Sequence, residues 1–204
     1  MYQVDERGDW LDGVERRPAA DLGGRLWRPE VLLIHYTAGA GREGDLAALT
    51  RSDDVYVSAH FHVGRSGRLT QLAPLTRVAW HAGVSEWGGR ENLNGWSIGV
   101  EFENWGPVRL VDGIYRSWTG AEVDAGRVTA AGGGFWESYG RGQLWTGLLL
   151  MQALARRFDL KWVLGHSDVS PGRKVDPGPA FPLGCYQRVL STVGKRGDPR
   201  EAAK

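Results

Sequence analysis

The 204-residue chain has one cysteine, almost no net charge and no long apolar run, and each shortage excludes a class of protein. The single cysteine, Cys185, cannot form an intramolecular disulfide, so a disulfide-stapled scaffold is excluded. The 25 basic and 24 acidic side chains leave a net charge of +1, which provides no long-range field to attract nucleic acid or an anionic membrane. No apolar stretch approaches the roughly 20 residues that a membrane span requires. We therefore expect neither a nucleic-acid nor a membrane partner, and nothing in the sequence implies a protein partner.

Length and composition favour one domain. With 42% hydrophobic residues, the chain can bury one sizeable core but is short for two. We expect a polar lead-in over residues 1–30, a single domain over residues 31–193 and a frayed tail over residues 194–204. Residues 1–7 lack the basic start and the apolar core of a signal peptide. We therefore expect a protein that is cytoplasmic as synthesised, wherever it acts.

The hydrophobic pattern predicts alternating strands and helices. Residues 31–34 form a continuous apolar run that is typical of a strand buried on both faces. The Asp112-Gly113 pair predicts the turn of a hairpin formed by residues 108–110 and 114–118. This mixture predicts a single domain of the α/β class. Further strands are expected at residues 55–63, 68–72, 97–103 and 161–164, and helices at residues 45–50, 143–158 and 183–193.

The most informative segment is the Pro- and Gly-rich stretch 165–181, which directly follows the apolar run 162–164. A loop held this stiffly can direct two donor side chains at one metal ion, and His166 and Asp176 are suitable donors. Lys174 would then lie near whatever the metal activates. The segment lacks a third ligand, which the rest of the chain has to supply.

Catalytic zinc sites take three protein ligands and leave one position for water, and four other histidines could supply the third ligand. His35 stands at the end of the apolar strand, His60 and His62 lie in a half-exposed hairpin, and His81 lies in a short Trp- and Gly-containing segment. A histidine that is only hydrogen-bonded is the commoner case, and spacing alone leaves the choice open. The His-Glu-x-x-His pattern of zinc proteases is absent from the sequence. Asp168 is expected to cap or orient its loop rather than to bind metal.

Several blocks of this sequence, taken in order, strongly resemble the zinc-dependent N-acetylmuramoyl-L-alanine amidases. The likeness is greatest to the AmpD-type branch, which is related to phage amidase lysozymes and peptidoglycan recognition proteins. It covers roughly residues 31–183 and implies a mixed central β-sheet flanked by helices, a Zn²⁺ cofactor and a peptidoglycan or muropeptide substrate. The blocks are Ile34-His35 and residues 57–60, 77–85, 94–101 and 165–181.

The resemblance also implies roles for individual residues. His35, His166 and Asp176 correspond to the zinc ligands of the family. Glu101 corresponds to the acidic residue that acts on the zinc-bound water. Lys174 corresponds to the lysine that supports the oxyanion.

Substrate contacts and two departures follow from the same likeness. Arg90 and Asn94 correspond to positions that contact substrate in the AmpD-type branch. Ala59 stands where phage lysozyme-type members carry a catalytic tyrosine, so we expect Glu101 to carry the proton. Residues 104–140 are longer than the matching stretch of AmpD-type enzymes, and this insertion could reshape the substrate groove. The insertion is rich in aromatic side chains, which include Trp105, Trp118, Phe135 and Trp136.

Amide hydrolysis suits these residue types. Zinc lowers the pKa of bound water to about 7 and polarises a carbonyl as a Lewis acid. A carboxylate such as that of Glu101 can take the water proton and hand it to the leaving amine. An ammonium group such as that of Lys174 stabilises charge that develops only in the transition state. The predicted reaction is therefore hydrolysis of the amide between N-acetylmuramic acid and L-alanine, with residues 31–193 as the catalytic domain.

The sequence leaves other functions, and other roles for single residues, open. A module of the same fold could bind peptidoglycan without cutting it, and a zinc protease could act on ordinary proteins. Glu101 and Glu103 could form the solvent face of a strand, and Lys174 could be an ordinary surface lysine. The presence of a full ligand set together with Glu101 and Lys174 favours the amidase.

The biological setting has two candidates. A cytoplasmic recycling enzyme would act on soluble anhydro-muropeptides, whereas an endolysin would attack the cell wall after release. The AmpD-like blocks favour recycling. The Trp-rich insertion and the weaker agreement around Tyr36 and Asn92 favour an endolysin, and the balance leans slightly toward the endolysin.

Overall fold

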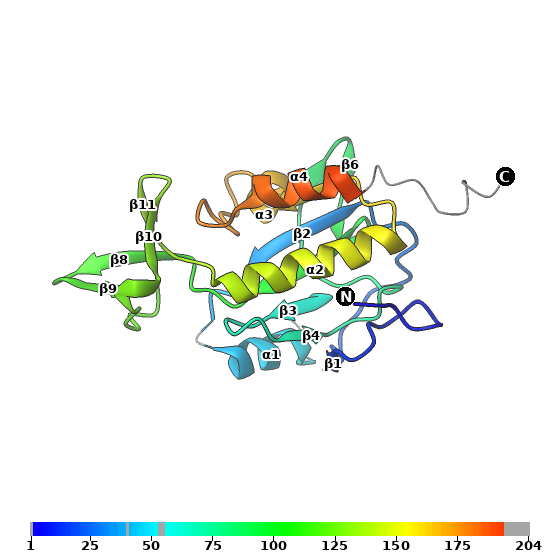
Figure 1. The fold of residues 1–204 in the computed structure, drawn as a ribbon, viewed down its shortest axis with the longest axis horizontal. Helices are drawn as coiled ribbons and strands as arrows, with labels where there is room; N and C mark the ends of the chain where they lie inside the picture. The colour runs from blue at the N-terminus through cyan, green and yellow to red at the C-terminus, as the bar shows by residue number, and fades with distance from the viewer. Residues whose placement is uncertain (1, 40, 53–55, 194–204) are drawn as a thin grey trace.

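A computed structural model describes residues 2–39, 41–52 and 56–193, arranged as shown in Figure 1. Its centre is a six-stranded mixed sheet with the strand order β1-β4-β3-β7-β2-β12. Strands β3, β7, β2 and β12 run parallel to one another, whereas β4 runs antiparallel to β3. The expected α/β class with a mixed central sheet is confirmed. The strands of this sheet are β1 (Glu15–Arg16), β2 (Val31–Tyr36), β3 (Phe61–Val63), β4 (Leu69–Gln71), β7 (Ser97–Phe102) and β12 (Trp162–Gly165).

The two faces of β2 are covered by different parts of the chain. Leu32 and Ile34 pack into the main core with Leu150 of helix α2. Leu33 points the other way, into a smaller cluster with Leu164. Because side chains alternate along a strand, the next residue of β2 on the same face as Leu33 is the polar His35. The helices are α1 (Arg42–Thr50), α2 (Arg141–Arg157), α3 (His166–Val169) and α4 (Leu183–Val193), with 3-10 turns η1 (Leu93–Gly95) and η2 (Ala125–Arg127).

A second, antiparallel sheet projects beyond the carboxyl end of β2 (Figure 1). Its strand order is β10-β11-β8-β9. The expected hairpin is confirmed, because Val111 pairs with Ile114 and the intervening Asp112 and Gly113 have positive φ angles of 51° and 79°. The sequence pattern does not predict β10 and β11, whose residues alternate weakly. This second sheet consists of β8 (Pro107–Val111), β9 (Ile114–Arg116), β10 (Val128–Ala131) and β11 (Gly134–Glu137).

Two expectations about the β3 region are wrong. Within residues 56–63 the strand is confined to β3, because Ser58 donates its backbone N–H to the carbonyl of Trp80 in a loop (2.9 Å) rather than to a strand. His60 and His62 are fully buried rather than half-exposed. Their burial follows from the position of β3, which lies between β4 and β7 instead of at an edge.

The remaining segments add little to these two sheets. A small ribbon of β5 (Glu86–Trp87) and β6 (Arg90–Glu91) lies in the long connection before β7. Residue 55 and the expected tail at 194–204 lie outside the described residues, and the division into lead-in, domain and tail stays a prediction. None of the helices in the described part of the chain combines the length and the hydropathy that crossing a membrane would require.

Candidate metal centre and its pocket

Three side chains that are distant in the sequence meet at the carboxyl end of β2. The Nδ1 atoms of His35 and His166 are 3.0 Å apart. The Oδ2 atom of Asp176 lies 3.0 Å from Nδ1 of His35 and 3.1 Å from Nδ1 of His166. All three residues are buried, and their ligand atoms are close enough to hold one metal ion. The structure therefore brings together the three residues expected as ligands.

Strand register accounts for this meeting. Gly165 ends β12 opposite Ile34 of β2, so His166 emerges beside the end of β2. Asp176 returns to the same place because Ser167 donates its backbone N–H to the carbonyl oxygen of Asp176 (2.9 Å). Asp168 turns away from the cluster, and its carboxylate accepts a hydrogen bond from the Gly165 N–H (2.8 Å) at the start of α3. The expected capping role of Asp168 is confirmed.

The donor set fits zinc. Two imidazole nitrogens and one carboxylate oxygen are ordinary zinc ligands, and three protein ligands leave the fourth tetrahedral position open. Ligand atoms about 2.0–2.1 Å from a tetrahedral ion lie roughly 3.3 Å from one another. The observed separations of 3.0–3.1 Å are close to that spacing. The pocket side of the cluster could therefore hold a metal that keeps one position for water.

A relay of hydrogen bonds fixes the protonation of the His35 ring. Ser97 donates its hydroxyl to the carbonyl oxygen of Leu93 (2.5 Å), so its oxygen is left to accept from Nε2 of His81 (3.4 Å). Nδ1 of His81 then accepts from Nε2 of His35 (3.1 Å). With its proton on Nε2, the His35 ring presents the lone pair of Nδ1 to the cluster.

The His166 ring is oriented in the same way from another direction. Its Nε2 donates to the carbonyl oxygen of Ala82 (3.0 Å), which leaves Nδ1 to face Asp176 and His35. Nη2 of Arg173 also donates to the Ala82 carbonyl (2.8 Å). Both ligand histidines thus have an outer partner that selects the ligating nitrogen.

Electrostatics keep the cluster in the form that binds a cation. Burial alone would raise the pKa of Asp176, but the hydrogen bonds with His166 and His35 hold that pKa well below its usual range. Burial lowers the pKa of His35, which favours the neutral ring. A neutral imidazole and an ionised carboxylate are the forms that ligate metals.

Glu101 lies beside the cluster, in β7. It pairs with His35 across the parallel strands, so both side chains point to the same face. Burial, reinforced by the negative charges of Asp176 and Asp45, raises the pKa of Glu101 to about 8, and the positive charge of Lys174 opposes the shift. Its Oε2 atom is buried and has no hydrogen-bond partner among the described residues. The solvent-face alternative is therefore wrong for Glu101.

These groups share a pocket of about 630 Å³. Lys174 is exposed and lines this pocket, so it is not an ordinary surface lysine remote from the cluster. Glu103, which shares the alternate positions of Glu101, is buried and paired with Arg65, and it is not part of the pocket. The pocket walls bring together the cluster, Glu101, Lys174 and the aromatic side chains of Tyr36, Tyr56 and Trp80.

The two residues expected to contact substrate are placed differently. Asn94 lines the pocket, and its Oδ1 accepts hydrogen bonds from the backbone N–H groups of His81 (2.9 Å) and Ala82 (2.8 Å). Arg90 is not among the lining residues. Its guanidinium pairs with Glu30 (2.7 Å) and stacks 4.8 Å from the ring centroid of Trp96. Their substrate contacts stay predictions.

Sequence reasoning missed the supporting role of His81 and Arg173. His81 was weighed only as a ligand, although a histidine in a loop next to a buried ligand strand is equally suited to orient that ligand. Arg173 donates to Ala82, Val84 and Ser170, which ties the site loop (residues 165–181) to the segment that carries His81. Its position directly before Lys174 was the available signal.

Comparison with known proteins agrees with this geometry. The chain is 35% identical over 188 residues to N-acetylmuramoyl-L-alanine amidase AmiD of Escherichia coli (strain K12), covering 88% of this chain and 58% of AmiD. It is 32% identical over 138 residues to 1,6-anhydro-N-acetylmuramyl-L-alanine amidase AmpD of the same organism, covering 66% of this chain and 59% of AmpD. The chain thus spans less than two thirds of the length of these curated relatives.

A solved structure extends the likeness to the fold. Escherichia coli AmiD, in complex with the substrate anhydro-N-acetylmuramic acid-L-Ala-D-gamma-Glu-L-Lys, superposes with a TM-score of 0.63 at 29% identity. The superposition covers 98% of this chain and 69% of that AmiD chain. Residues 26–179, which include the whole metal cluster, match the family Amidase_2, described as N-acetylmuramoyl-L-alanine amidase. The chain belongs to this N-acetylmuramoyl-L-alanine amidase family.

Proposed function

We propose that this protein hydrolyses the amide between the lactyl group of N-acetylmuramic acid and L-alanine in peptidoglycan or its fragments, with zinc as cofactor. The observation that carries the proposal is the buried triangle of His35, His166 and Asp176 in one pocket with Glu101 and Lys174. The AmiD complex with an anhydro-muropeptide supports the choice of substrate class.

The residues of the chain divide the reaction among them. His35, His166 and Asp176 would hold the zinc ion, which supplies a Lewis acid and a water of lowered pKa when bound. The Glu101 carboxylate takes a proton from the attacking water as the C–O bond forms. The same proton passes to the amine nitrogen of L-alanine as the C–N bond breaks.

Lys174 and the pocket walls complete this assignment. Lys174 lines the pocket. Its positive charge opposes the rise in the pKa of Glu101 and adds to the lowering of the pKa of His35 by burial. A cation at this position stabilises the negative charge that develops on the carbonyl oxygen. Burial raises the pKa of Glu101, and once ionised such a carboxylate is a stronger proton acceptor than one of ordinary pKa.

The test is product analysis with the zinc-loaded protein. Purified N-acetylmuramoyl-L-alanyl peptide is incubated with the protein, and mass spectrometry is expected to find free N-acetylmuramic acid and a peptide with a new L-alanine amino terminus. Casein serves as a control substrate and is expected to stay intact. Casein cleavage without muropeptide cleavage would indicate a protease instead, and binding without any product would indicate a non-catalytic module.

The setting is part of the same proposal. We favour action on the cell wall after release, as for an endolysin, over recycling of soluble anhydro-muropeptides. The aromatic-rich second sheet beside the pocket supports this choice. Comparing release of peptides from intact sacculi with cleavage of isolated anhydro-muropeptides tests it, and exclusive cleavage of the soluble fragments would contradict it.

A further inference from the structure

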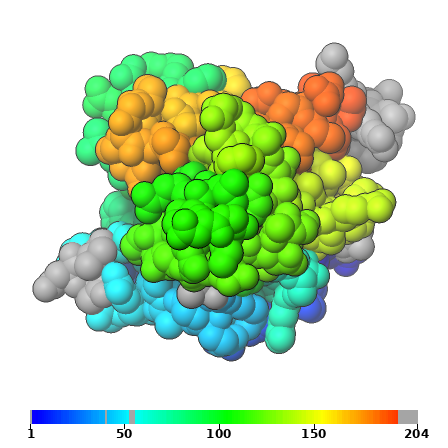
Figure 2. Space-filling model, turned by 90° about the vertical axis from the view of Figure 1, so that its left-hand side faces the viewer, coloured from blue at the N-terminus to red at the C-terminus, as the bar shows by residue number. Residues whose placement is uncertain are grey.

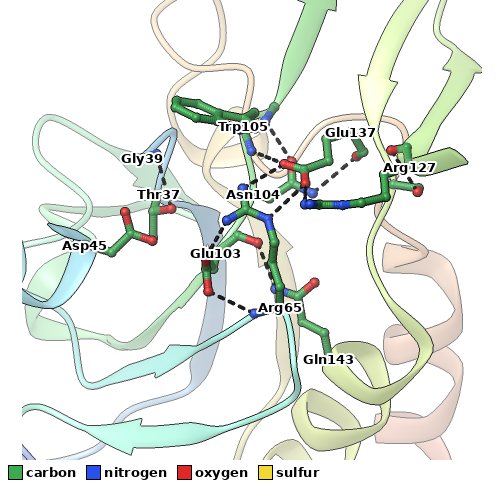
Figure 3. A network of polar contacts seen from close by, with 12 residues as sticks. Thr37, Gly39, Asp45, Arg65, Glu103, Asn104, Trp105, Arg127, Glu137 and Gln143 are labelled. Atoms are coloured by element: carbon green, nitrogen blue, oxygen red, sulfur yellow. Dashed lines mark hydrogen bonds and ion pairs between the residues drawn. The ribbon is translucent and has the colours of Figure 1, made fainter. Parts of the chain in front are cut away.

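The second sheet (β8–β11) is locked to the central domain by a buried ion cluster (Figure 3). Glu137 at the end of β11 is only 1% exposed. Its carboxylate accepts hydrogen bonds from Nε (2.9 Å) and Nη2 (3.0 Å) of Arg65 and from the backbone N–H of Trp105 (2.5 Å), and it is also paired with Arg127. Arg65 binds Glu103 as well. A sheet held by charged hydrogen bonds at its base has a defined position relative to the domain.

The same sheet contacts one lip of the metal pocket. Tyr36 and Ala38 line the pocket. The indole N–H of Trp118, which follows β9, donates to the carbonyl oxygen of Ala38 (2.8 Å). Gly106, just before β8, lies against the Tyr36 ring so closely that a β-carbon there would be 2.4 Å from it.

The sheet also contacts the part of the site loop that directly follows Asp176, a residue that lines the pocket. A β-carbon on Gly178 would lie 2.4 Å from the ring of Trp136 in β11, so the two groups are packed together. Tyr139 donates its hydroxyl to the carbonyl oxygen of Pro177 (2.8 Å). In Figure 2 the green surface of the second sheet accordingly lies directly against the orange surface of the site loop. The second sheet therefore borders the pocket, with contacts to Tyr36 and Ala38 in its wall and to the loop next to Asp176.

Trp118 is more exposed than Phe135, the other exposed aromatic side chain in the described part of this border. Its side chain is 66% exposed, although its one polar group is used by Ala38. An indole with a committed N–H is held in orientation, and what remains free is a flat apolar face. Sugar rings present flat C–H faces that stack on such surfaces. Stem peptides instead carry carboxylates, for which the Lys174 ammonium lines the pocket.

The volume of the pocket also favours a saccharide contact outside it. A pocket of about 630 Å³ is in the range that holds one small-molecule-sized ligand. It can enclose the muramyl residue and the first part of the peptide, but a longer glycan strand must leave across a lip. The lip at Ala38 is the one at which an exposed aromatic face is fixed.

From these contacts we infer that Trp118 is a sugar-binding platform, which stacks on a saccharide unit of the glycan strand next to the muramyl residue whose amide is cut. This deepens the proposed function and rests on it, because it makes strand-linked peptidoglycan the preferred substrate over short soluble muropeptides. The ligand class is an uncharged pyranose within a β-linked amino-sugar polymer.

The experiment measures binding and cleavage separately, with the full zinc-loaded chain. Trp118→Ala is compared with the unchanged protein and with Trp145→Ala, which removes a similarly exposed (63%) tryptophan on α2. Binding is measured with peptide-free glycan strands, and cleavage with intact sacculi and with N-acetylmuramoyl-L-alanyl-D-isoglutamine. Zinc content and thermal melting verify that each variant is folded.

For Trp118→Ala we expect strand binding and sacculus cleavage to fall roughly five- to tenfold, the order of an aromatic stacking contact, with cleavage of the short substrate within about twofold. Trp118→Phe, which keeps a flat face but loses the N–H that orients it, is expected to restore part of the loss, and Trp145→Ala to change nothing. Unchanged strand binding in Trp118→Ala, or an equal loss on both substrates, would overturn the inference. Strand binding that depends on Trp118 in a protein that cleaves neither substrate would uphold the platform and refute the proposed function.

Discussion

His35 and Glu101 are direct partners in the register of the parallel strands β2 and β7. One belongs to the buried triangle of candidate ligands and the other has an unpartnered carboxylate oxygen beside it. Two rigid neighbouring strands thus set the distance between the metal position and the candidate base. This precision is what a proton transfer in the transition state requires.

Removing a ligand is expected to remove the metal. His35→Ala or Asp176→Ala leaves two protein donors, so zinc content measured by elemental analysis should fall from about one per chain to near zero. Muropeptide cleavage should be lost with it. Asp159→Ala, which changes a carboxylate that is 90% exposed, is the matched control and should keep its zinc. Full activity in a zinc-free preparation of either ligand variant would refute the metal assignment.

Glu101→Gln separates metal binding from turnover. The amide keeps the size of the side chain but cannot accept the water proton, so we expect normal zinc content and a turnover number about 10²- to 10⁴-fold lower. Glu91→Gln alters an exposed strand residue away from the pocket and should be neutral. If Glu101→Gln turned over at the normal rate, Glu101 would have only a structural role.

The relay behind His35 is testable without any substrate. His81→Ala removes the partner of Nε2 of His35, so zinc affinity should fall about 10- to 100-fold in a chelator competition. Gly99→Ala provides a second route to the same effect, because a β-carbon there would lie 2.5 Å from the His81 ring. An unchanged zinc dissociation constant in both variants would show that the His35 ring is oriented by other contacts.

The pKa of Glu101 predicts a pH dependence of stability in the metal-free protein. Folded Glu101 keeps its proton up to about pH 8, whereas the unfolded chain releases it near its ordinary value of 4.5. Between these values the folded state binds the extra proton, so the free energy of unfolding should fall as pH rises, by at most about 1.4 kcal/mol per pH unit.

The window from about pH 7.5 to 8 isolates this effect. Burial lowers the pKa values of His35, His60 and His81 in the folded state, and about one pH unit above the ordinary value of 6.5 these rings are almost entirely neutral in the unfolded state as well. Denaturant unfolding of the chelator-treated protein at several pH values measures the slope. Glu101→Gln should flatten it, and an equal slope in that variant would assign the pH dependence to another group.

The residues alone predict two candidate ligands, a histidine and an aspartate on one stiff loop, and leave the third open among four histidines. The family resemblance, which depends on several blocks in order along the chain, implies His35 as the third, and the structure brings it to the other two. The central strands could be predicted from the residues, since residues 31–34 and 162–164 are short apolar runs with clear boundaries.

The features that could not be predicted depend on contacts formed only in the folded chain. The burial of His62 depends on β3 lying between β4 and β7, and hydrophobic period does not determine strand order. The pairing of Arg90 with Glu30 and its stacking on Trp96 are likewise not visible in a sequence pattern. Strands β10 and β11 alternate too weakly to be recognised and owe their pairing to the Gly132-Gly133 turn, with φ angles of 57° and 79°.

The spacing of the ligands along the chain has a consequence for how the protein matures. His35 and Asp176 are separated by 141 positions, and β12, which brings the second half of the site to β2, is near the end of the described chain. Because a chain emerges from the ribosome amino terminus first, the three candidate ligands cannot meet until synthesis has passed Asp176. A translation product interrupted before that residue would therefore lack one of the three donors.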